Sequence, residues 1–200
     1  MLECGAVQWQ WKEEVFPHHD QFTSLHDRLI DRWRYLARDL PGQRLWVTHH
    51  ADDLHEDTLT TTYMRDLAEQ AGLETRGVLI ENIGIDAEGR IVDEEDYLIT
   101  AIFKLYPWEW IVAEEFGRDI VRRLDATLWL EPIWKMLWSN KAILPLLWEL
   151  APNHPNLLPA GWDAASVGPR HVAKPILARE GANITIVEDG EETGRSAGPY

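Results

Sequence analysis

Apolar residues recur at helical spacing in two stretches of the first half of the chain. In the first stretch the repeating residues are Leu25, Leu29, Trp33, Leu36, Ala37 and Leu40. This pattern predicts an amphipathic helix that begins at Thr23 or Ser24 and ends at the Pro-Gly-Gln of 41–43. In the second stretch the repeating residues are Leu59, Tyr63, Leu67 and Ala71. There we expect Asp57 to be the N-cap and Gly72 the C′ glycine.

Short apolar runs between turn residues predict the strands. These runs are RLWVTH (44–49), TRGVLIENIGI (75–85), YLITAIFKLYPW (97–108), TLWLE (127–131), HVAKPIL (171–177) and NITIVED (183–189). AREGA (178–182) is expected to link the last two as a hairpin, and DGEETGRSAGPY (189–200) to form no element. Further helices are predicted at 6–16, 108–124 and from Asn140 or Lys141. Strands that alternate with helices, without an internal repeat, indicate an α/β or α+β fold.

Charge and composition restrict the possible partners. The formal net charge is −15, from 34 acidic and 19 basic residues, so a polyanion would be repelled and nucleic acid is not an expected partner. No apolar run approaches the roughly 20 residues of a membrane span, and the start has no signal-peptide pattern. The single Cys4 excludes an internal disulfide framework and fits a reducing cytoplasm. The sequence does not predict the oligomeric state.

Lys141, Lys174 and the loop Ala178–Gly181 form the first candidate site. Phosphate binding requires cationic groups, backbone N–H donors and small residues that allow close approach. Lys141 is expected in the first turn of a helix or in the loop before it, beside exposed N–H groups and the positive end of the dipole. Lys174 is expected within a strand, before Pro175, and the loop could close over a ligand. An edge strand with ordinary surface charges explains the same residues equally well.

Two other segments are chemically suggestive. HHADDLHED (49–57) holds three histidines and four acids, but its spacing matches no common zinc pattern, and a solvated loop is the simpler interpretation. An intermediate possibility is that Glu56 and Asp57 bind a cationic amine. Lys104, in FKLYPWEW (103–110), could line a pocket, although core packing is the better interpretation.

Four segments resemble the glutathionylspermidine synthase family of ATP-grasp carboxylate–amine ligases. They are AVQWQW (6–11), HEDTLTTTYMRDLAEQAGL (55–73), LEPIWKMLWSNKAILPLLWELAPNHPNLLPA (130–160) and AKPILAREGANI (173–184). The resemblance extends over the whole chain. It implies a partial ATP-grasp fold and ATP-dependent amide formation, in which ATP phosphorylates a carboxylate and an amine attacks the acyl phosphate.

The resemblance also implies roles for individual residues. Lysines at the positions of Lys141 and Lys174 hold the ATP phosphates, and Arg179, Glu180 and Gly181 belong to the loop that covers them. Ala178 stands where the family often has glycine. Glu56 and Asp57 match the acidic pair near the substrate amine, and the other substrate is a small-molecule or peptide carboxylate.

The resemblance further implies a single domain over 1–200 that is truncated at both ends. In the family the Mg²⁺ ligands precede LECGAVQWQW, and a strand that helps to bind ATP follows GPY. Without the metal the developing phosphoryl charge lacks its main electrostatic stabilisation, so this chain alone is expected to be inactive. The alternative is a catalytically inactive nucleotide- or peptide-binding protein that keeps the fold.

Overall fold

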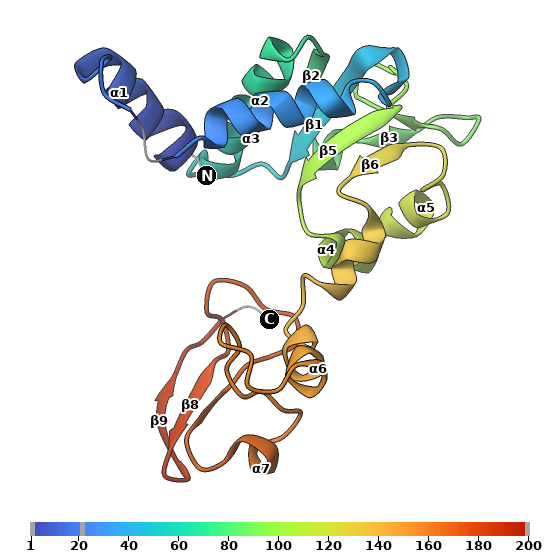
Figure 1. Ribbon diagram of the computed structural model, residues 1–200. Helices are drawn as coiled ribbons and strands as arrows, with labels where there is room; N and C mark the ends of the chain where they lie inside the picture. Colours follow the sequence, from blue (N-terminus) through green and yellow to red (C-terminus); the bar gives the residue numbers. More distant parts are fainter. Residues whose placement is uncertain (1–2, 21–22, 199–200) are drawn as a thin grey trace. The chain divides into compact units, whose positions relative to one another are not determined.

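The computed structural model describes residues 3–20 and 23–198. The chain divides into two compact units, Met1–Ile133 and Trp134–Tyr200, which are described separately (Figure 1). Helices and a parallel sheet build the first unit, and short helices and an antiparallel sheet build the second. This mixed α/β architecture confirms the fold class predicted from the sequence. None of the helices in the described residues is long and apolar enough to cross a membrane.

The first unit contains most of the regular structure. Its helices are η1 (Glu3–Val7), α1 (Gln8–Val15), α2 (Leu25–Leu36), η2 (Pro41–Gln43), α3 (Glu56–Gln70), η3 (Ile80–Asn82), α4 (Trp108–Ala113) and α5 (Gly117–Val121). Its strands are β1 (Arg44–His49), β2 (Glu74–Leu79), β3 (Gly84–Ile85), β4 (Ile91–Val92), β5 (Ala101–Leu105) and β6 (Leu128–Leu130).

The main sheet has the strand order β2-β1-β5-β6, and all three neighbouring pairs are parallel. Four successive residues of β1, from Leu45 to Thr48, are buried, as expected for a parallel strand covered on both faces. From β1 the chain runs outward to β2 on one side and later returns to β5 on the other. The carboxyl ends of β1 and β5 therefore flank a topological switch point, where open α/β sheets usually bind ligands.

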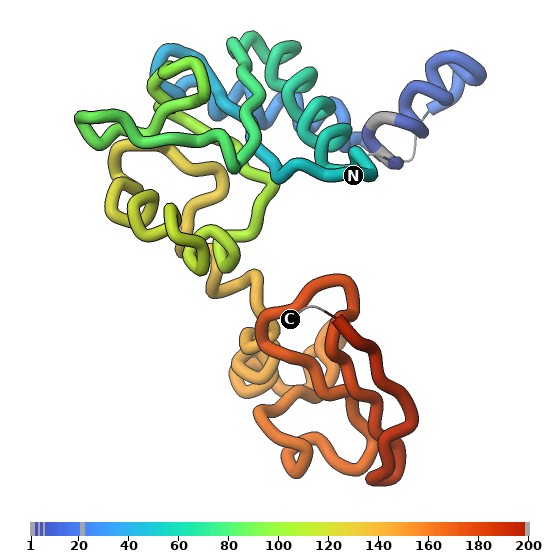
Figure 2. The backbone as a smooth tube through the Cα atoms, turned by 180° about the vertical axis from the view of Figure 1, so that it is seen from behind, coloured from blue at the N-terminus to red at the C-terminus, as the bar shows by residue number. Residues whose placement is uncertain are grey.

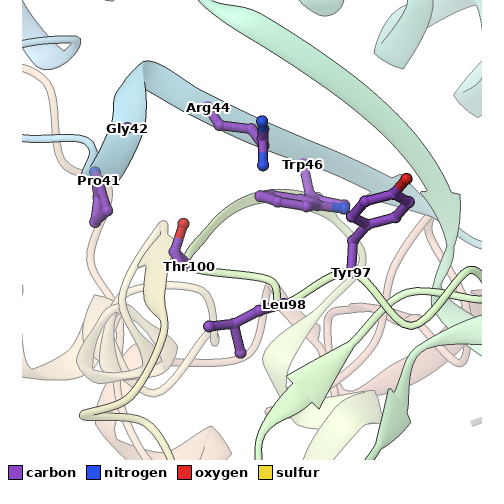
Figure 3. A pocket seen from close by; sticks show the side chains of 7 residues that line it. All are labelled: Pro41, Gly42, Arg44, Trp46, Tyr97, Leu98 and Thr100. Carbon is purple, nitrogen blue, oxygen red and sulfur yellow. The ribbon is translucent and has the colours of Figure 1, made fainter.

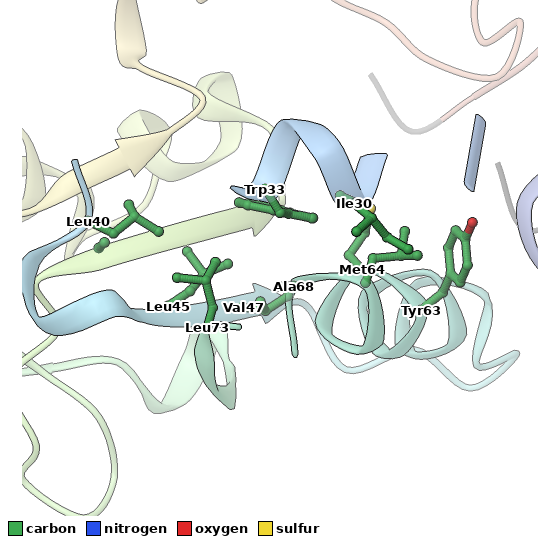
Figure 4. Packing of buried hydrophobic residues seen from close by; sticks show 11 residues of the cluster. Ile30, Trp33, Leu40, Leu45, Val47, Tyr63, Met64, Ala68 and Leu73 are labelled. Atoms are coloured by element: carbon green, nitrogen blue, oxygen red, sulfur yellow. The ribbon is translucent and has the colours of Figure 1, made fainter. Parts of the chain in front are cut away.

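Helices α2 and α3 cover one face of this sheet. Alternate residues of β1, Leu45 and Val47, belong to one buried cluster with Trp33 of α2 and Ala68 of α3 (Figure 4). Side chains alternate between the faces of a strand, so Trp46 lies on the opposite face, where its Nε1 donates to Asp93 over 2.8 Å. Side chains from one face of β1 and from the inward faces of α2 and α3 together form this core.

The boundary between the units falls within η4 (Ile133–Leu137). In the second unit α6 (Ile143–Leu150) comes next, and α7 (Ala164–Val167) follows a long loop. Strands β7 (His171–Ala173), β8 (Thr185–Glu188) and β9 (Glu191–Arg195) form an antiparallel sheet in that order. Figure 2 follows this backbone from α6 to the three strands. The predicted β7–β8 pairing is confirmed. The prediction that 189–200 forms no element is wrong, because β9 pairs with β8.

Candidate functional site

Lys141 lies in the loop immediately before α6, as predicted. Its backbone N–H donates to Ile176 O over 3.0 Å, and its Nζ donates to Ala178 O over 2.5 Å. These two bonds place Lys141 against the segment that follows β7. The prediction of exposed N–H donors here is wrong at two residues, because Lys141 N is bonded to Ile176 and Ala142 N to Asn140 Oδ1.

Lys174 is exposed and stands one residue beyond the end of β7. Its predicted position within a strand is therefore wrong. Pro175 has no N–H to donate to a sheet ladder, which explains why the strand ends before it. Because Lys141 N is bonded to Ile176 O, the backbone of Lys141 contacts a residue only two positions from Lys174. The structure thus brings both lysines to the same segment of the second unit.

Arg179, Glu180 and Gly181 form a tight turn that Ala182 closes by donating its N–H to Arg179 O over 2.9 Å. Glu180 and Gly181 have φ of 53° and 75°, and positive φ at both central residues is characteristic of a type I′ turn. Gly181 adopts this conformation without a steric penalty. The carbonyl of Gly181 also accepts a hydrogen bond from Ser196 Oγ, which anchors the turn to the segment after β9.

Glu56 and Asp57 are the first two residues of α3, at the carboxyl end of β1 in the first unit. The prediction that Asp57 is the N-cap is wrong. His55 occupies that position with φ of 57°, and the carboxylate of Asp52 accepts the N–H groups of Asp57 over 3.0 Å and Thr58 over 3.3 Å. Asp52 lies in the loop before α3, and its side chain caps the N-terminus of this helix.

Hydrogen bonds from Thr58 Oγ1 and these two N–H groups stabilise the charged form of Asp52. Burial opposes ionisation, but the hydrogen bonds outweigh it and hold the pKa of Asp52 below its ordinary value. Asp52 is therefore a carboxylate that supports the loop in which Glu56 and Asp57 stand.

The sheet brings together further polar residues that the sequence did not single out. His50, just after β1, pairs with Glu81 in η3 at 2.6 Å, and its ring lies 5.9 Å from that of Tyr106, just after β5. The Tyr106 hydroxyl donates to Glu114. Burial, together with the neighbouring Glu114 carboxylate, raises the pKa of Tyr106, so it remains a neutral donor. The sequence held one clue to this cluster, which is that His50, Glu81 and Tyr106 come shortly after the carboxyl ends of β1, β2 and β5.

The histidine-rich loop is held by internal contacts. His49 lies 3.0 Å from Thr58 Oγ1 through Nε2 and 3.2 Å from Thr61 Oγ1 through Nδ1. Within residues 3–20 and 23–198, no group of three or more His, Cys, Asp or Glu side chains is arranged to hold a metal ion. The described residues therefore do not form a Mg²⁺ site by themselves.

Lys104 is part of the core, which agrees with the preferred prediction from the sequence. It is 7% exposed, its Nζ donates to Tyr106 O over 2.9 Å, and it lies 4.8 Å from the centre of the Trp108 ring. A buried ammonium that is bonded to a carbonyl and faces an aromatic ring is a stable core arrangement.

The molecule is thus an α/β protein with a switch point in one unit and two lysines around a tight turn in the other. The family profile described as "Glutathionylspermidine synthase preATP-grasp" matches residues 1–200. The chain therefore belongs to the glutathionylspermidine synthase pre-ATP-grasp family, which confirms the resemblance seen in the sequence.

Three relatives are all named as ligases or synthetases. A Haemophilus influenzae protein named as an acid–amine ligase is 39% identical over 195 residues, which cover 94% of this chain and 49% of the relative. The trypanothione synthetase of Crithidia fasciculata is 30% identical, over 100% of this chain and 34% of that protein. The bifunctional glutathionylspermidine synthetase/amidase of Escherichia coli is 29% identical, over 95% and 34%. The chain thus spans between a third and a half of the relatives it matches.

Proposed function

We propose that this chain is part of an ATP-dependent carboxylate–amine ligase of the ATP-grasp type. In such a reaction a carboxylate takes the γ-phosphoryl group of ATP, ADP leaves, and an amine displaces phosphate from the acyl phosphate to form the amide. The observation that carries the proposal is the contact of Lys141 with the segment 174–178, made by hydrogen bonds to Ile176 O and Ala178 O. Membership of a family whose relatives are named as synthetases supports it.

In this proposal Lys141 and Lys174 bind the ATP phosphates. Ammonium groups are common phosphate ligands, and Lys174 is exposed at the end of β7, where a ligand can reach it. Arg179, Glu180 and Gly181 form the covering turn. Lys141 Nζ donates one hydrogen bond to the Ala178 carbonyl, and an ammonium group has two further N–H donors that can bind a phosphate.

In the same proposal Glu56 and Asp57 bind the amine substrate. Glu56 is exposed at the first turn of α3, and the loop before it is fixed by Asp52, so a carboxylate is held ready for an ammonium group. The positive end of the helix dipole opposes an ammonium there, and two carboxylates offset it. We further propose a small-molecule or peptide carboxylate as the second substrate, Mg²⁺ held by residues outside this chain, and a cytoplasmic location.

The nucleotide site is tested by calorimetric titration of Mg-ATP. We would use this chain and a version extended at both ends with the matching segments of the Haemophilus influenzae relative. Lys141→Ala and Lys174→Ala should each weaken ATP binding by more than about 1.5 kcal/mol, as expected for a charge-assisted contact. Arg170→Ala is the matched control, because Arg170 is an exposed cation of the same unit that pairs only loosely with Glu188, at 3.8 Å. Unchanged affinity in both lysine variants would remove the assignment.

The amine side needs a separate measurement. Glu56→Ala in the extended protein should raise KM for the amine and leave ATP affinity near normal. Asp53→Ala, an exposed carboxylate of the same loop, serves as the control. A change in ATP affinity without a change in the KM for the amine would count against this role.

A further inference from the structure

The segment 196–198, which follows β9, contacts the turn at 179–181. One residue beyond the paired strands β8 and β9, the backbone N–H of Ser196 donates to Ile184 O over 2.9 Å. The pairing of the two strands therefore continues up to the residue from which the chain enters β8. This places Ser196 beside the carboxyl side of the turn.

The hydroxyl of Ser196 holds the turn through two hydrogen bonds. It donates to the carbonyl of Gly181, and it accepts the N–H of Ile184 over 2.9 Å. A serine hydroxyl can do both at once, because it has one proton to donate and two acceptor positions. Gly181 is a central residue of the turn, so one side chain fixes both the turn and the residue that precedes β8.

Close packing adds to these bonds. Ala182, the residue after the turn, is 7% exposed, and a Cβ atom placed on Gly198 would lie only 2.2 Å from the Cβ of Ala182. The backbone at Gly198 therefore lies directly against Ala182, at an approach that only glycine allows. Contacts at Gly181, Ala182 and Ile184 together hold the carboxyl side of the turn.

The amino side of the turn is held by Lys141. Its Nζ donates to Ala178 O over 2.5 Å, and its backbone N–H donates to Ile176 O over 3.0 Å. The exposed residues 179–181 lie between this contact and that of Ser196. The position of the turn relative to Lys141 is therefore set from both of its sides.

We propose that Ser196 is a positioning residue of the phosphate site, because its hydroxyl fixes the turn at 179–181 beside Lys141 before ATP binds. The inference rests on the proposed function, which assigns the ATP phosphates to Lys141, Lys174 and this turn. A covering turn that is already ordered loses less conformational entropy when its ligand binds, so ATP binds more tightly. Without the hydroxyl, Gly181 O and Ile184 N lose a fixed partner, and the turn becomes more mobile.

A role limited to the stability of the hairpin leads to a different expectation. In that case the loss of the hydroxyl would weaken the binding of every nucleotide to the same extent, through the fraction of unfolded protein. A positioning role affects ATP more than AMP, because AMP lacks the two outer phosphates that the turn would cover.

The first measurement uses the 200-residue chain without nucleotide. Ser196→Ala removes the acceptor of the Ile184 N–H, so amide exchange at Ile184, followed by ¹H–¹⁵N NMR, should become about fivefold faster. Ser196→Thr keeps the hydroxyl and should restore the slow exchange. Ser166→Ala is the matched control, since the Ser166 hydroxyl also donates to a backbone carbonyl of the second unit, Asp163 O, over 2.7 Å.

The second measurement is calorimetric titration of Mg-ATP and of AMP into the version extended at both ends. Ser196→Ala should weaken Mg-ATP binding about fivefold, as for the loss of one hydrogen bond, and leave AMP binding nearly unchanged. Ser196→Thr and the control Ser166→Ala should both bind Mg-ATP like the wild type.

The proposal is overturned if Ile184 exchanges equally fast in Ser196→Ala and in the wild type, if Ser196→Ala weakens ATP and AMP binding alike, or if it leaves Mg-ATP affinity unchanged. A failure of the proposed function looks different. If Lys141→Ala and Lys174→Ala bind Mg-ATP as tightly as the wild type, the phosphate site itself is wrong, and the role of Ser196 is wrong with it. If the lysine variants lose affinity and Ser196→Ala does not, only the role of Ser196 is wrong.

Discussion

Asp93 connects strand β4, the loop before β5 and the opposite face of β1 through hydrogen bonds to one carboxylate. It is 7% exposed and accepts from Trp46 Nε1 and from the N–H groups of Glu95 and Tyr97. Trp46 and Tyr97 both line an open pocket of about 450 Å³ (Figure 3). Burial opposes its ionisation, but the Trp46 and backbone bonds, with Arg76 nearby, outweigh this and lower the pKa of Asp93 below its ordinary value. Its negative charge is therefore part of the fold.

Asp93→Asn should lower the free energy of unfolding by about 2 kcal/mol at pH 7, because an amide oxygen replaces a charged acceptor. The folded-state pKa is depressed, so the stability from this group is fully present above its unfolded pKa of about 3.9. It is lost as the pH falls through that value toward the folded pKa. Urea unfolding at several pH values should show a constant difference between wild type and variant from pH 7 to 5, shrinking below about pH 4. A difference that grew on acidification would contradict the argument.

Asp52 has a comparable role at the start of α3. Its carboxylate replaces the side-chain cap that His55, the residue at the N-cap position, does not provide. Asp52→Ala should therefore lower the melting temperature, and Asp53→Ala, which removes an exposed neighbour, should leave it nearly unchanged. Circular dichroism melting curves of the two variants measure this. Equal melting temperatures would show that the cap contributes nothing.

At the scale of single elements, helix periodicity predicted α3 well but not its exact buried face. Gly72 has φ of 94°, and Leu73 N donates to Ala68 O over 3.0 Å, which confirms the predicted C′ glycine. Leu67 is 0% exposed, as predicted, but Leu59 is 56% exposed. Leu59 lies in the first turn, and periodicity alone does not show how far the partner surface extends along a helix.

Leu67→Ala and Leu59→Ala test this difference directly. Removing the Leu67 side chain leaves a cavity between α3, α2 and β1, and should lower the free energy of unfolding by about 2–5 kcal/mol. Leu59→Ala should change it by less than about 0.5 kcal/mol, as is usual for exposed sites. Urea unfolding followed by circular dichroism compares the two. Similar losses in both variants would mean that the Leu59 side chain is covered in solution.

The second unit shows where local sequence patterns fail. Leu146 and Leu150 of the apolar helix α6 are 47% and 82% exposed, while Pro145 is buried. Strand β9 has a polar sequence, EETGR, and forms because β8 offers it an edge. Polar strands are specified by their pairing partner, and that partner is not part of the local sequence.

At the scale of the molecule, the sequence predicted one part of the candidate site and missed another. Lys141, Lys174 and the turn at 179–181 were expected together, and the structure brings them to one segment of the second unit. The contacts among His50, Glu81, Tyr106 and Glu114 were not expected, because they require the strand order β2-β1-β5. Local spacing can predict a loop and its lysines, but contacts between loops depend on the topology of the sheet.

The net charge of −15 acts on the whole molecule. Like charges repel in the compact state, and the Debye length falls from about 30 Å to about 10 Å between 0.01 and 0.1 M salt. Raising NaCl over this range at pH 7 should therefore raise the melting temperature by about 2–4 °C, which corresponds to about 1 kcal/mol for a chain of this size. Near pH 4.8, the isoelectric point calculated from the sequence, the repulsion largely disappears and the salt effect should vanish. If salt instead lowered the melting temperature at pH 7, attractive pairs such as Arg76 with Glu95 would dominate the electrostatics of the fold.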